Sequence, residues 1–333
     1  MARTAPPARM HGKRAFRRAG DFFSSTPSAG SSHSPPHMAA AVALSEALFD
    51  APEAVALEHG ESGISGAGGL ALYHQWWRPY GRARAAVVVV HGLKDHSARY
   101  GAFAEKLVAA RFAVHAFDLR GHARSAGARA WVGSFDDYVG DLDAVVRRVL
   151  ARERDPLLFV FGHGLGGTIA TTWAIQRPRL CAGLVLSGAL LQPKDAPAEA
   201  RRTRLLAKLA PWTRTFQIDV RRTSRDRGTV EDALRDCLVQ QGPAPARTAR
   251  ELLDAMSRID TQAALLTTPL LAMHGSADAV ESPDGSKRIV ARAGSVDKQL
   301  YLYDGLAHDL LHEPERARVL RDVSAWLDER APS

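Results

Sequence analysis

Short runs of apolar, often β-branched residues alternate with longer segments of helical periodicity along most of the chain. The strand-like runs are Leu70–Trp77, Ala86–His91, Phe112–Asp118, Leu157–Phe161, Leu184–Ser187, Leu270–His274 and Gln299–Tyr303. The helical segments include Ala102–Arg111, Phe135–Arg152, Leu165–Gln176 and Glu313–Leu327. Strands that alternate with helices predict a mostly parallel sheet, wound by right-handed crossovers and flanked by helices. We therefore expect an α/β fold.

One stretch interrupts this alternation. Residues 189–268 contain the helical segments Glu199–Leu209, Thr229–Val239 and Ala246–Ile259 but no strand-like run. We interpret this stretch as a helical insertion into a core formed by residues 50–188 and 269–330.

The first 37 residues differ in composition from the rest. They are rich in Arg, Ser, Pro and Gly, and they hold six basic residues against one acid. We expect no structure here. A basic, acid-poor segment also suits an organelle transit peptide, and translation that starts at Met38 is a third alternative.

Charge and cysteine content exclude several classes of function. The net charge is +8, but residues 1–37 account for +5 of it, so the remaining chain gives no electrostatic argument for nucleic acid. Unbroken apolar runs such as Ala85–Val90 are far shorter than the roughly 20 residues of a membrane span. Two distant cysteines, Cys181 and Cys237, form no disulfide framework, which favours a reducing compartment.

Glycine-rich or polar loops follow four of the predicted strands. They are His91–Ser97, Gly162–Gly167, Gly275–Asp278 and Asp304–His308. Open parallel sheets place their sites at the carboxyl ends of strands, so these loops are expected to meet. A glycine turn, then an aspartate, then a histidine is the order of nucleophile, acid and base in α/β-hydrolases.

Four strings within these loops and nearby carry a more specific resemblance. HGLKDHSARY (91–100), DLRGHARSAG (118–127), HGSADAVESPDGS (274–286) and YDGLAHDLLHEPER (303–316) resemble the motifs of monoacylglycerol lipases and related lysophospholipases. The resemblance covers residues 65 to 328. It implies the α/β-hydrolase fold, with 189–268 as the helical lid. It also implies a small lipid or ester ligand, namely a monoacylglycerol or lysophospholipid, and an apolar tunnel under the lid.

The resemblance assigns roles in acyl transfer through serine. His308 corresponds to the general base and Asp278 to the acid that orients it. The backbone N–H groups of Leu93 and Leu165 correspond to the donors that hold the oxyanion. His163 flanks the site and is expected to support the structure. No cofactor is implied, and the histidines show no metal-ligand spacing.

The nucleophile departs from the family pattern, because Gly-x-Ser-x-Gly is Gly162-His163-Gly164-Leu165-Gly166 here. Glycine has no side chain that can attack a carbonyl, so the chain as written is expected to be inactive or very weak. Two explanations remain open. Gly164 is either natural, which makes the chain a pseudo-hydrolase that binds lipids or esters, or a substitution or sequence error in an active enzyme.

The same glycines also match the dinucleotide fingerprint Gly-x-Gly-x-x-Gly. That site needs an acid at the end of the next strand, and the stretch Gly183–Gly188 has none. We therefore exclude dinucleotide binding.

The first helix of the insertion combines basic and apolar residues. They are Arg201, Arg202, Arg204 and Lys208 with Leu205, Leu206, Leu209 and Trp212. This pattern suits peripheral contact with an anionic membrane, and the alternative is a solvated helix packed on the core. The chain is thus expected in the cytoplasm or on a membrane surface, unless residues 1–37 direct it to an organelle. In the lid, Asp236-Cys237 stands where the family usually has Asp-Pro, which leaves the acyl preference open.

Overall fold

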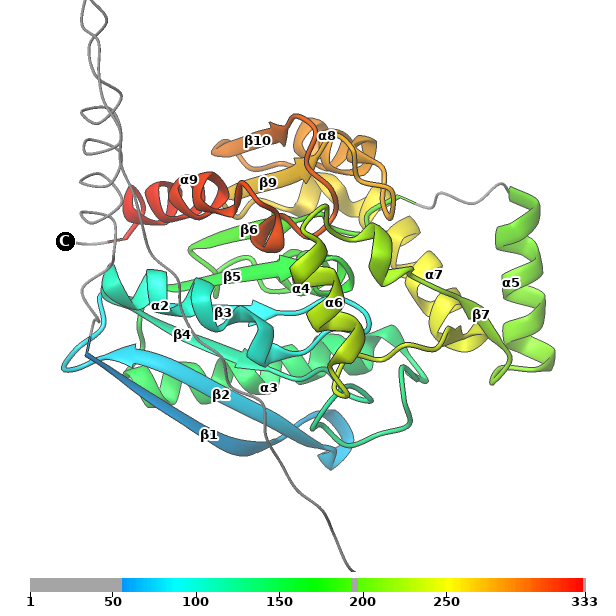
Figure 1. The fold of residues 1–333 in the computed structure, drawn as a ribbon, viewed down its shortest axis with the longest axis horizontal. Helices are drawn as coiled ribbons and strands as arrows, with labels where there is room; N and C mark the ends of the chain where they lie inside the picture. Colours follow the sequence, from blue (N-terminus) through cyan, green and yellow to red (C-terminus); the bar gives the residue numbers. More distant parts are fainter. Residues whose placement is uncertain (1–55, 193–196, 332–333) are drawn as a thin grey trace, which may run out of the picture. The chain divides into compact units, whose positions relative to one another are not determined.

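The computed structural model describes residues 56–192 and 197–331, and an eight-stranded sheet lies at its centre (Figure 1). Its strands are β1 (Leu57–Ser65), β2 (Ala71–Pro79), β3 (Ala85–Val90), β4 (Phe112–Phe117), β5 (Leu158–His163), β6 (Gly183–Ser187), β9 (Leu270–Gly275) and β10 (Lys298–Tyr303). They are ordered β1-β2-β4-β3-β5-β6-β9-β10, and only the β1–β2 and β2–β4 pairs are antiparallel. The predicted mostly parallel sheet is confirmed. The predictions about residues 1–37 lie outside the described residues.

Helices cover both faces of this sheet. The described helices are α2 (Gly101–Ala109), α3 (Phe135–Glu153), α4 (Leu165–Gln176), α5 (Pro197–Leu209), α6 (Arg227–Arg235), α7 (Ala246–Gln262), α8 (Pro283–Arg292) and α9 (Arg316–Asp328). α2 and α9 pack on one face, and α3, α4 and α8 pack on the other.

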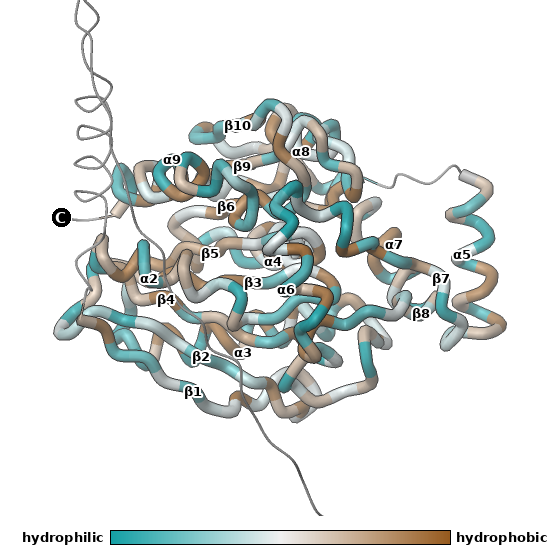
Figure 2. The backbone as a smooth tube through the Cα atoms, in the orientation of Figure 1, coloured by the Kyte–Doolittle hydropathy of each residue, from teal (hydrophilic) through white to brown (hydrophobic). Residues whose placement is uncertain are grey.

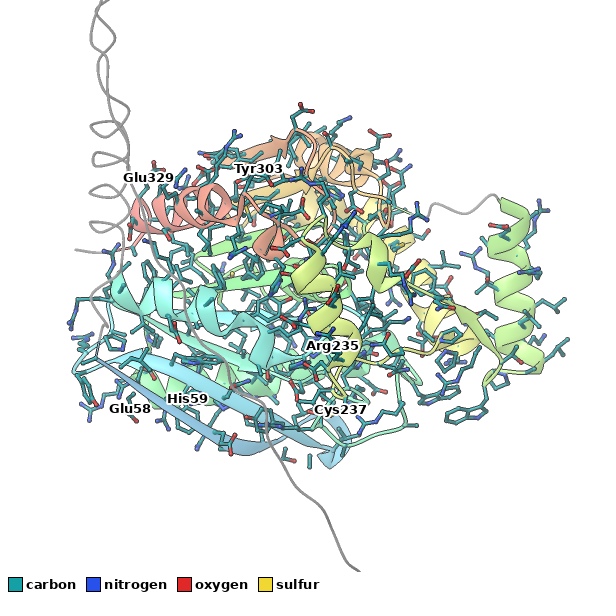
Figure 3. The ribbon with its side chains drawn as sticks, viewed as in Figure 1. Glu58, His59, Arg235, Cys237, Tyr303 and Glu329 are labelled. Carbon is teal, nitrogen blue, oxygen red and sulfur yellow. The ribbon has the colours of Figure 1, made fainter. Side chains whose placement is uncertain are left out.

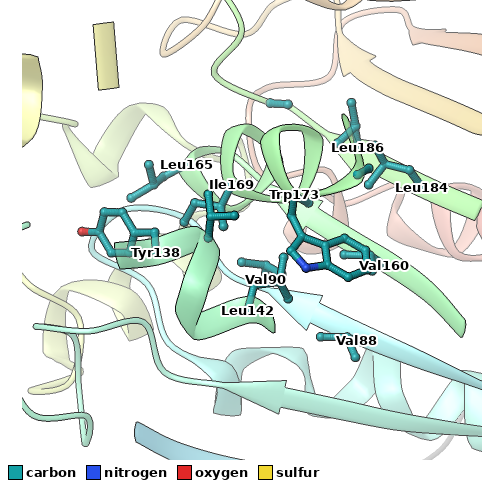
Figure 4. Packing of buried hydrophobic residues seen from close by; sticks show 14 of the residues in the cluster. Val88, Val90, Tyr138, Leu142, Val160, Leu165, Ile169, Trp173, Leu184 and Leu186 are labelled. Atoms are coloured by element: carbon teal, nitrogen blue, oxygen red, sulfur yellow. The ribbon is translucent and has the colours of Figure 1, made fainter. Parts of the chain in front are cut away.

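The core follows from the two-residue period of the strands. Val87 and Val89 of β3 join the apolar cluster under α2 and α9, whereas Val88 and Val90 join the cluster under α3 and α4. All six residues of β3 are buried, as expected for a strand covered on both faces. Figure 4 shows Trp173 of α4 within the cluster under α3 and α4. Figure 2 shows that hydrophobic residues gather along the central strands.

β1 was not predicted from the sequence. It runs along β2 over its full length and forms one edge of the sheet. None of its residues is fully buried, so Leu57–Ser65 lacks the apolar face that marks a strand in sequence. Polar residues such as Glu58 and His59 are found along β1 instead (Figure 3). The ring of His59 stacks on Trp77 of β2, with ring centroids 5.0 Å apart.

The insertion contains α5, α6 and α7, close to the predicted helical segments. The expectation that it holds no strand was wrong, because β7 (Arg214–Phe216) and β8 (Ala244–Pro245) form a two-stranded antiparallel sheet. These strands are only three and two residues long, which is too short for a periodic signal. α5 packs on α7 at the margin of the domain (Figure 1). No helix within the described ranges has the length and apolar character needed to cross a membrane.

Candidate active site

The four loops singled out in the sequence meet at the carboxyl ends of the parallel strands. Leu93 follows β3, Gly164 follows β5, Asp278 follows β9 and His308 follows β10. These residues share one edge of the sheet because their strands run parallel within it.

Gly164 lies in the sharp turn between β5 and α4. Its φ is 52° and its ψ is −119°, a conformation that costs a residue with a Cβ roughly 1–3 kcal/mol. Gly166 allows the turn to approach β3 closely, since a Cβ on Gly166 would lie 2.0 Å from the Val90 carbonyl oxygen. The turn is also held from both sides: the Gly164 N–H donates to the Ser187 carbonyl, and its own carbonyl accepts from the Leu190 N–H.

His308 faces this turn from the opposite side. A Cβ built on Gly164 would lie 3.5 Å from His308 Nε2. On the other side of the ring, Nδ1 donates to Asp278 Oδ2 at 2.7 Å. Asp278 is itself fixed, because its Oδ1 accepts from the N–H groups of Val280 at 2.7 Å and Glu281 at 2.8 Å. This bonding leaves Nε2 of a neutral His308 free to accept a proton from the side of Gly164.

Burial and charge act in opposite directions on this pair. Burial alone lowers the pKa of His308, but the hydrogen bond and charge of Asp278 outweigh it and raise that pKa above its ordinary value. Burial alone raises the pKa of Asp278, but the nearby His274 ring and the bond from His308 lower it well below its ordinary range. His274 Nε2 lies 3.0 Å from Asp278 Oδ2. Asp278 is thus an anion that holds His308 in one tautomer, which is what a general base requires.

Leu93 and Leu165 both line the space over this turn. Leu165 is the first residue of α4, and the first N–H groups of a helix have no partner within it. Leu93 lies in the loop after β3, and His91 stabilises this loop. The Nδ1 of His91 donates to the Gly92 carbonyl, and the Nε2 of His91 accepts from the Leu119 N–H. The positive end of the α4 dipole adds to the attraction for a negative oxygen at this place.

His163 packs against the candidate base, with ring centroids 4.7 Å apart. Its Nδ1 donates to the Ser187 carbonyl at 3.0 Å. Burial, followed by the charge of His308, lowers the pKa of His163 to about 4. It is therefore neutral at pH 7, and its Nε2 is an acceptor.

A buried charge network that was not assigned from the sequence joins the loops after β3 and β10. Arg99 donates to Asp95 Oδ1 at 3.0 Å and to Asp309 Oδ2 at 3.3 Å, and the Tyr100 hydroxyl donates to Asp95 Oδ2 at 2.9 Å. Burial alone raises the pKa of Asp95, but Arg99 outweighs it and lowers that pKa to about 2. The only signal in the sequence was the motif DHSARY itself, which does not name the partner after β10.

Lys94 connects the loop after β3 to the insertion 189–268, for which we keep the name lid that the resemblance suggests. Its Nζ donates to the Ile218 carbonyl at 2.8 Å and the Gln241 carbonyl at 3.4 Å, and its own carbonyl accepts from the Gln240 N–H. His96 Nε2 lies 2.8 Å from Asp236 Oδ2 of the lid. The lid is thus fastened to the loop that carries the Leu93 N–H.

Two separate cavities replace the single apolar tunnel expected under the lid. One, of about 40 Å³, lies over Gly164 and is lined on the lid side by Ile218, Val220 and Val239. The other, of about 370 Å³, lies between α5, α7 and the core, with Leu206 and Met256 in its mixed polar and apolar lining. The two cavities share no lining residue. Only the second has the size of a ligand pocket.

Metal binding finds no support in the described ranges, where no group of three or more His, Cys, Asp or Glu side chains is arranged to hold an ion.

Comparison with known proteins places this geometry in a family. Residues 81–315 match the family model described as serine aminopeptidase, S33. The monoacylglycerol lipase of Mycolicibacterium smegmatis is 34% identical over 80% of this chain and 96% of its own. The human monoglyceride lipase is 32% identical over 79% of this chain and 89% of its own. The crystal structure of the Paleococcus ferrophilus monoacylglycerol lipase superposes with a TM-score of 0.69 at 27% identity, covering 83% of this chain and 99% of that one. The chain therefore has the α/β-hydrolase fold and belongs to the serine aminopeptidase S33 family of hydrolases, as a monoacylglycerol lipase-like member.

Proposed function

We propose that this chain binds carboxylic esters of the monoacylglycerol or lysophospholipid type, with the ester carbonyl over Gly164. As written, it is at most a weak hydrolase. His308, Asp278 and the N–H groups of Leu93 and Leu165 supply the base, its orienting acid and the oxyanion donors. Gly164 stands at the position of the nucleophile and has no hydroxyl.

One observation carries this proposal: a Cβ on Gly164 would lie 3.5 Å from His308 Nε2 and 3.6 Å from the Gly92 Cα. A serine side chain would therefore fit without a clash, and its hydroxyl would come within hydrogen-bonding reach of the base. The intact His308–Asp278 bond supports an acyl-transfer site around the missing group.

The test is hydrolysis of p-nitrophenyl butyrate by this chain and by Gly164→Ser, side by side. We expect the serine variant to be faster by on the order of 10³-fold or more, since removal of such a serine elsewhere costs up to about 10⁶-fold in kcat. Adding His308→Ala to the serine variant should abolish the gain. That loss would show that the new hydroxyl acts through His308.

A folded serine variant that stays inactive would contradict the hydrolase-like site. It would favour the second candidate, a protein on the same fold that binds a lipid or ester without cleaving it. The cavity of about 370 Å³ under the lid supports ligand binding in either case.

We further propose that α5 contacts anionic lipid. Leu205, Leu209 and the nearby Trp212 are 57%, 72% and 58% exposed, and Lys208 is exposed among them. Trp212 is held outward by a stack on Trp131, with ring centroids 3.6 Å apart. Apolar side chains beside a cation on one helix suit the boundary between headgroups and acyl chains.

A further inference from the structure

The space between Gly164 and His308 is polar as well as open. Its boundary includes His308 Nε2, which accepts because Nδ1 donates to Asp278. His163 Nε2 is a second acceptor, because its Nδ1 donates to the Ser187 carbonyl. Both rings line the cavity over Gly164, together with Leu93 and Leu165.

The small volume of that cavity limits which molecules can occupy it. Its volume is about 40 Å³, and a buried water needs roughly 10–15 Å³ of such space and two to four polar partners. One or two waters therefore fit, whereas a serine side chain would fill part of this space with carbon. A water here can donate one hydrogen to His308 Nε2, as the serine hydroxyl does in the family.

We propose that this chain hydrolyses activated esters directly, with a water beside Gly164 as the nucleophile and His308 as its general base, and without a covalent acyl-enzyme. This inference rests on the proposed function in one respect, namely that an ester carbonyl is held over Gly164 by the Leu93 and Leu165 N–H groups. The reaction adds an activity that the loss of serine would otherwise exclude.

The step balances with water as the only co-reactant. The water oxygen forms a bond to the carbonyl carbon while His308 Nε2 takes one of its protons. The carbonyl π electrons move to the oxygen, and the resulting anion accepts from the two backbone N–H groups. The tetrahedral intermediate then collapses: the C=O bond re-forms, the bond to the leaving oxygen breaks, and His308 returns the proton to that oxygen. The products are the carboxylic acid and the alcohol.

Gly164→Ala is the sharpest test, because it fills the proposed water position and leaves every catalytic group in place. Its methyl group would sit 3.5 Å from Nε2. If residual hydrolysis came only from the oxyanion donors and bulk water, Gly and Ala would be equally active. We expect p-nitrophenyl butyrate hydrolysis by the native chain to exceed that by Gly164→Ala and by His308→Gln by roughly 10²–10⁴-fold, the usual range of general-base catalysis.

Strain in the alanine variant needs its own control. Gly68 also has a positive φ, 68°, and a Cβ there would meet nothing within 4 Å. Gly68→Ala controls for a positive φ alone, since its ψ of 16° lies in the left-handed α region and is less strained than the ψ of −119° at Gly164, and it should keep the native rate. Thermal unfolding of each variant shows whether it is folded at the assay temperature.

Methanol gives a second readout that does not depend on the alanine variant. If water attacks the ester in the first step, methanol should compete at the same place, raise the rate of p-nitrophenolate release and yield methyl butyrate. In Gly164→Ser, acylation precedes methanol, so the rate of acylation should stay unchanged. Intact-protein mass spectrometry should find a covalently added butyryl group on the Gly164→Ser variant only.

The outcomes separate this inference from the proposed function. Equal rates for the native chain, Gly164→Ala and His308→Gln would overturn direct water attack, as would a butyryl adduct on the native chain. If Gly164→Ser is active at the same time, the ester site stands and only the water mechanism fails. If Gly164→Ser is also inactive while folded, the ester site itself fails.

Discussion

The loops that form the site and the lid that covers them are built in opposite ways. We call residues 91–100, 162–167, 275–281 and 304–313 the catalytic floor. Apart from the exposed Asp304, its charged groups are buried or partly buried and bonded, as in the bonds of Asp95 to Arg99 and of Asp278 to His308. In the lid helix α5, by contrast, the Arg204–Asp254 pair is partly exposed and the large apolar side chains face outward.

This difference explains how the catalytic floor can lack its nucleophile and remain intact. Gly164 contributes only backbone bonds: its N–H donates to the Ser187 carbonyl, and its carbonyl accepts from the N–H groups of Gly167 and Leu190. Glycine keeps these bonds and relieves the strain of a positive φ. Replacement of any paired charge nearby would leave its partner buried and alone, so the catalytic floor tolerates change at Gly164 and at few other places.

The largest effect on kcat should come from removing the Asp278 carboxylate, which orients the base His308. In the Gly164→Ser background, Asp278→Asn keeps the shape but no longer fixes the donor tautomer of His308, so kcat should fall by about 10⁴-fold. The exposed Asp284→Asn in the same background should stay within a few-fold. Ester hydrolysis at saturating substrate measures both, and a loss below 10-fold for Asp278→Asn would remove the dyad from the mechanism.

Next in size is the contrast between two ion pairs. Asp95→Ala leaves the Tyr100 hydroxyl without its buried acceptor and leaves Arg99 with Asp309 alone, so the free energy of unfolding should fall by about 3–5 kcal/mol. Asp254→Ala in the lid breaks a partly exposed pair and should cost about 0–1 kcal/mol. Urea unfolding followed by circular dichroism compares them, and similar losses would mean that the two regions are not built differently.

A smaller effect should appear where the catalytic floor holds the lid. Lys94 is 3% exposed, and Lys94→Met keeps its aliphatic length but removes the donor to the Ile218 and Gln241 carbonyls. A hydrogen bond from a charged group contributes about 1.5–3 kcal/mol, so amide exchange in residues 218–241 should quicken by roughly 10-fold or more. Lys208→Met on α5 is the matched control. Unchanged exchange in the Lys94 variant would show that other contacts hold the lid.

The degree of burial also explains which strands could be predicted from the sequence. β3 was predicted within one residue at each end, because a strand buried on both faces reads as an unbroken apolar run. β1 was missed because it is an edge strand without a buried face, and β7 and β8 because they are too short to show a period. The meeting of the four loops at one sheet edge followed from the parallel topology, and the resemblance to monoacylglycerol lipases assigned Asp278 and His308 their places beside Gly164.

Contacts between distant segments could not be predicted in this way. Nothing in the string HGLKDHS indicates that the Lys94 ammonium reaches two lid carbonyls, or that His96 meets Asp236. Such partners depend on how a long side chain is directed, and the period of apolar residues carries no information about them.

The smallest effect on stability, and the one that tests the outward face of the lid, should come from Leu209→Ser. Leu209 is 72% exposed, so the free energy of unfolding should change by less than about 0.5 kcal/mol. Binding to phosphatidylglycerol vesicles should weaken by roughly 10-fold, because insertion of a leucine side chain into lipid contributes about 1.5–3 kcal/mol. Val296→Ser is the matched control, since Val296 is fully exposed in the loop before β10 and lies outside the lid. Equal binding by both variants would remove α5 from the membrane contact, whereas a selective loss would show that the lid meets lipid while the catalytic floor keeps its bonds.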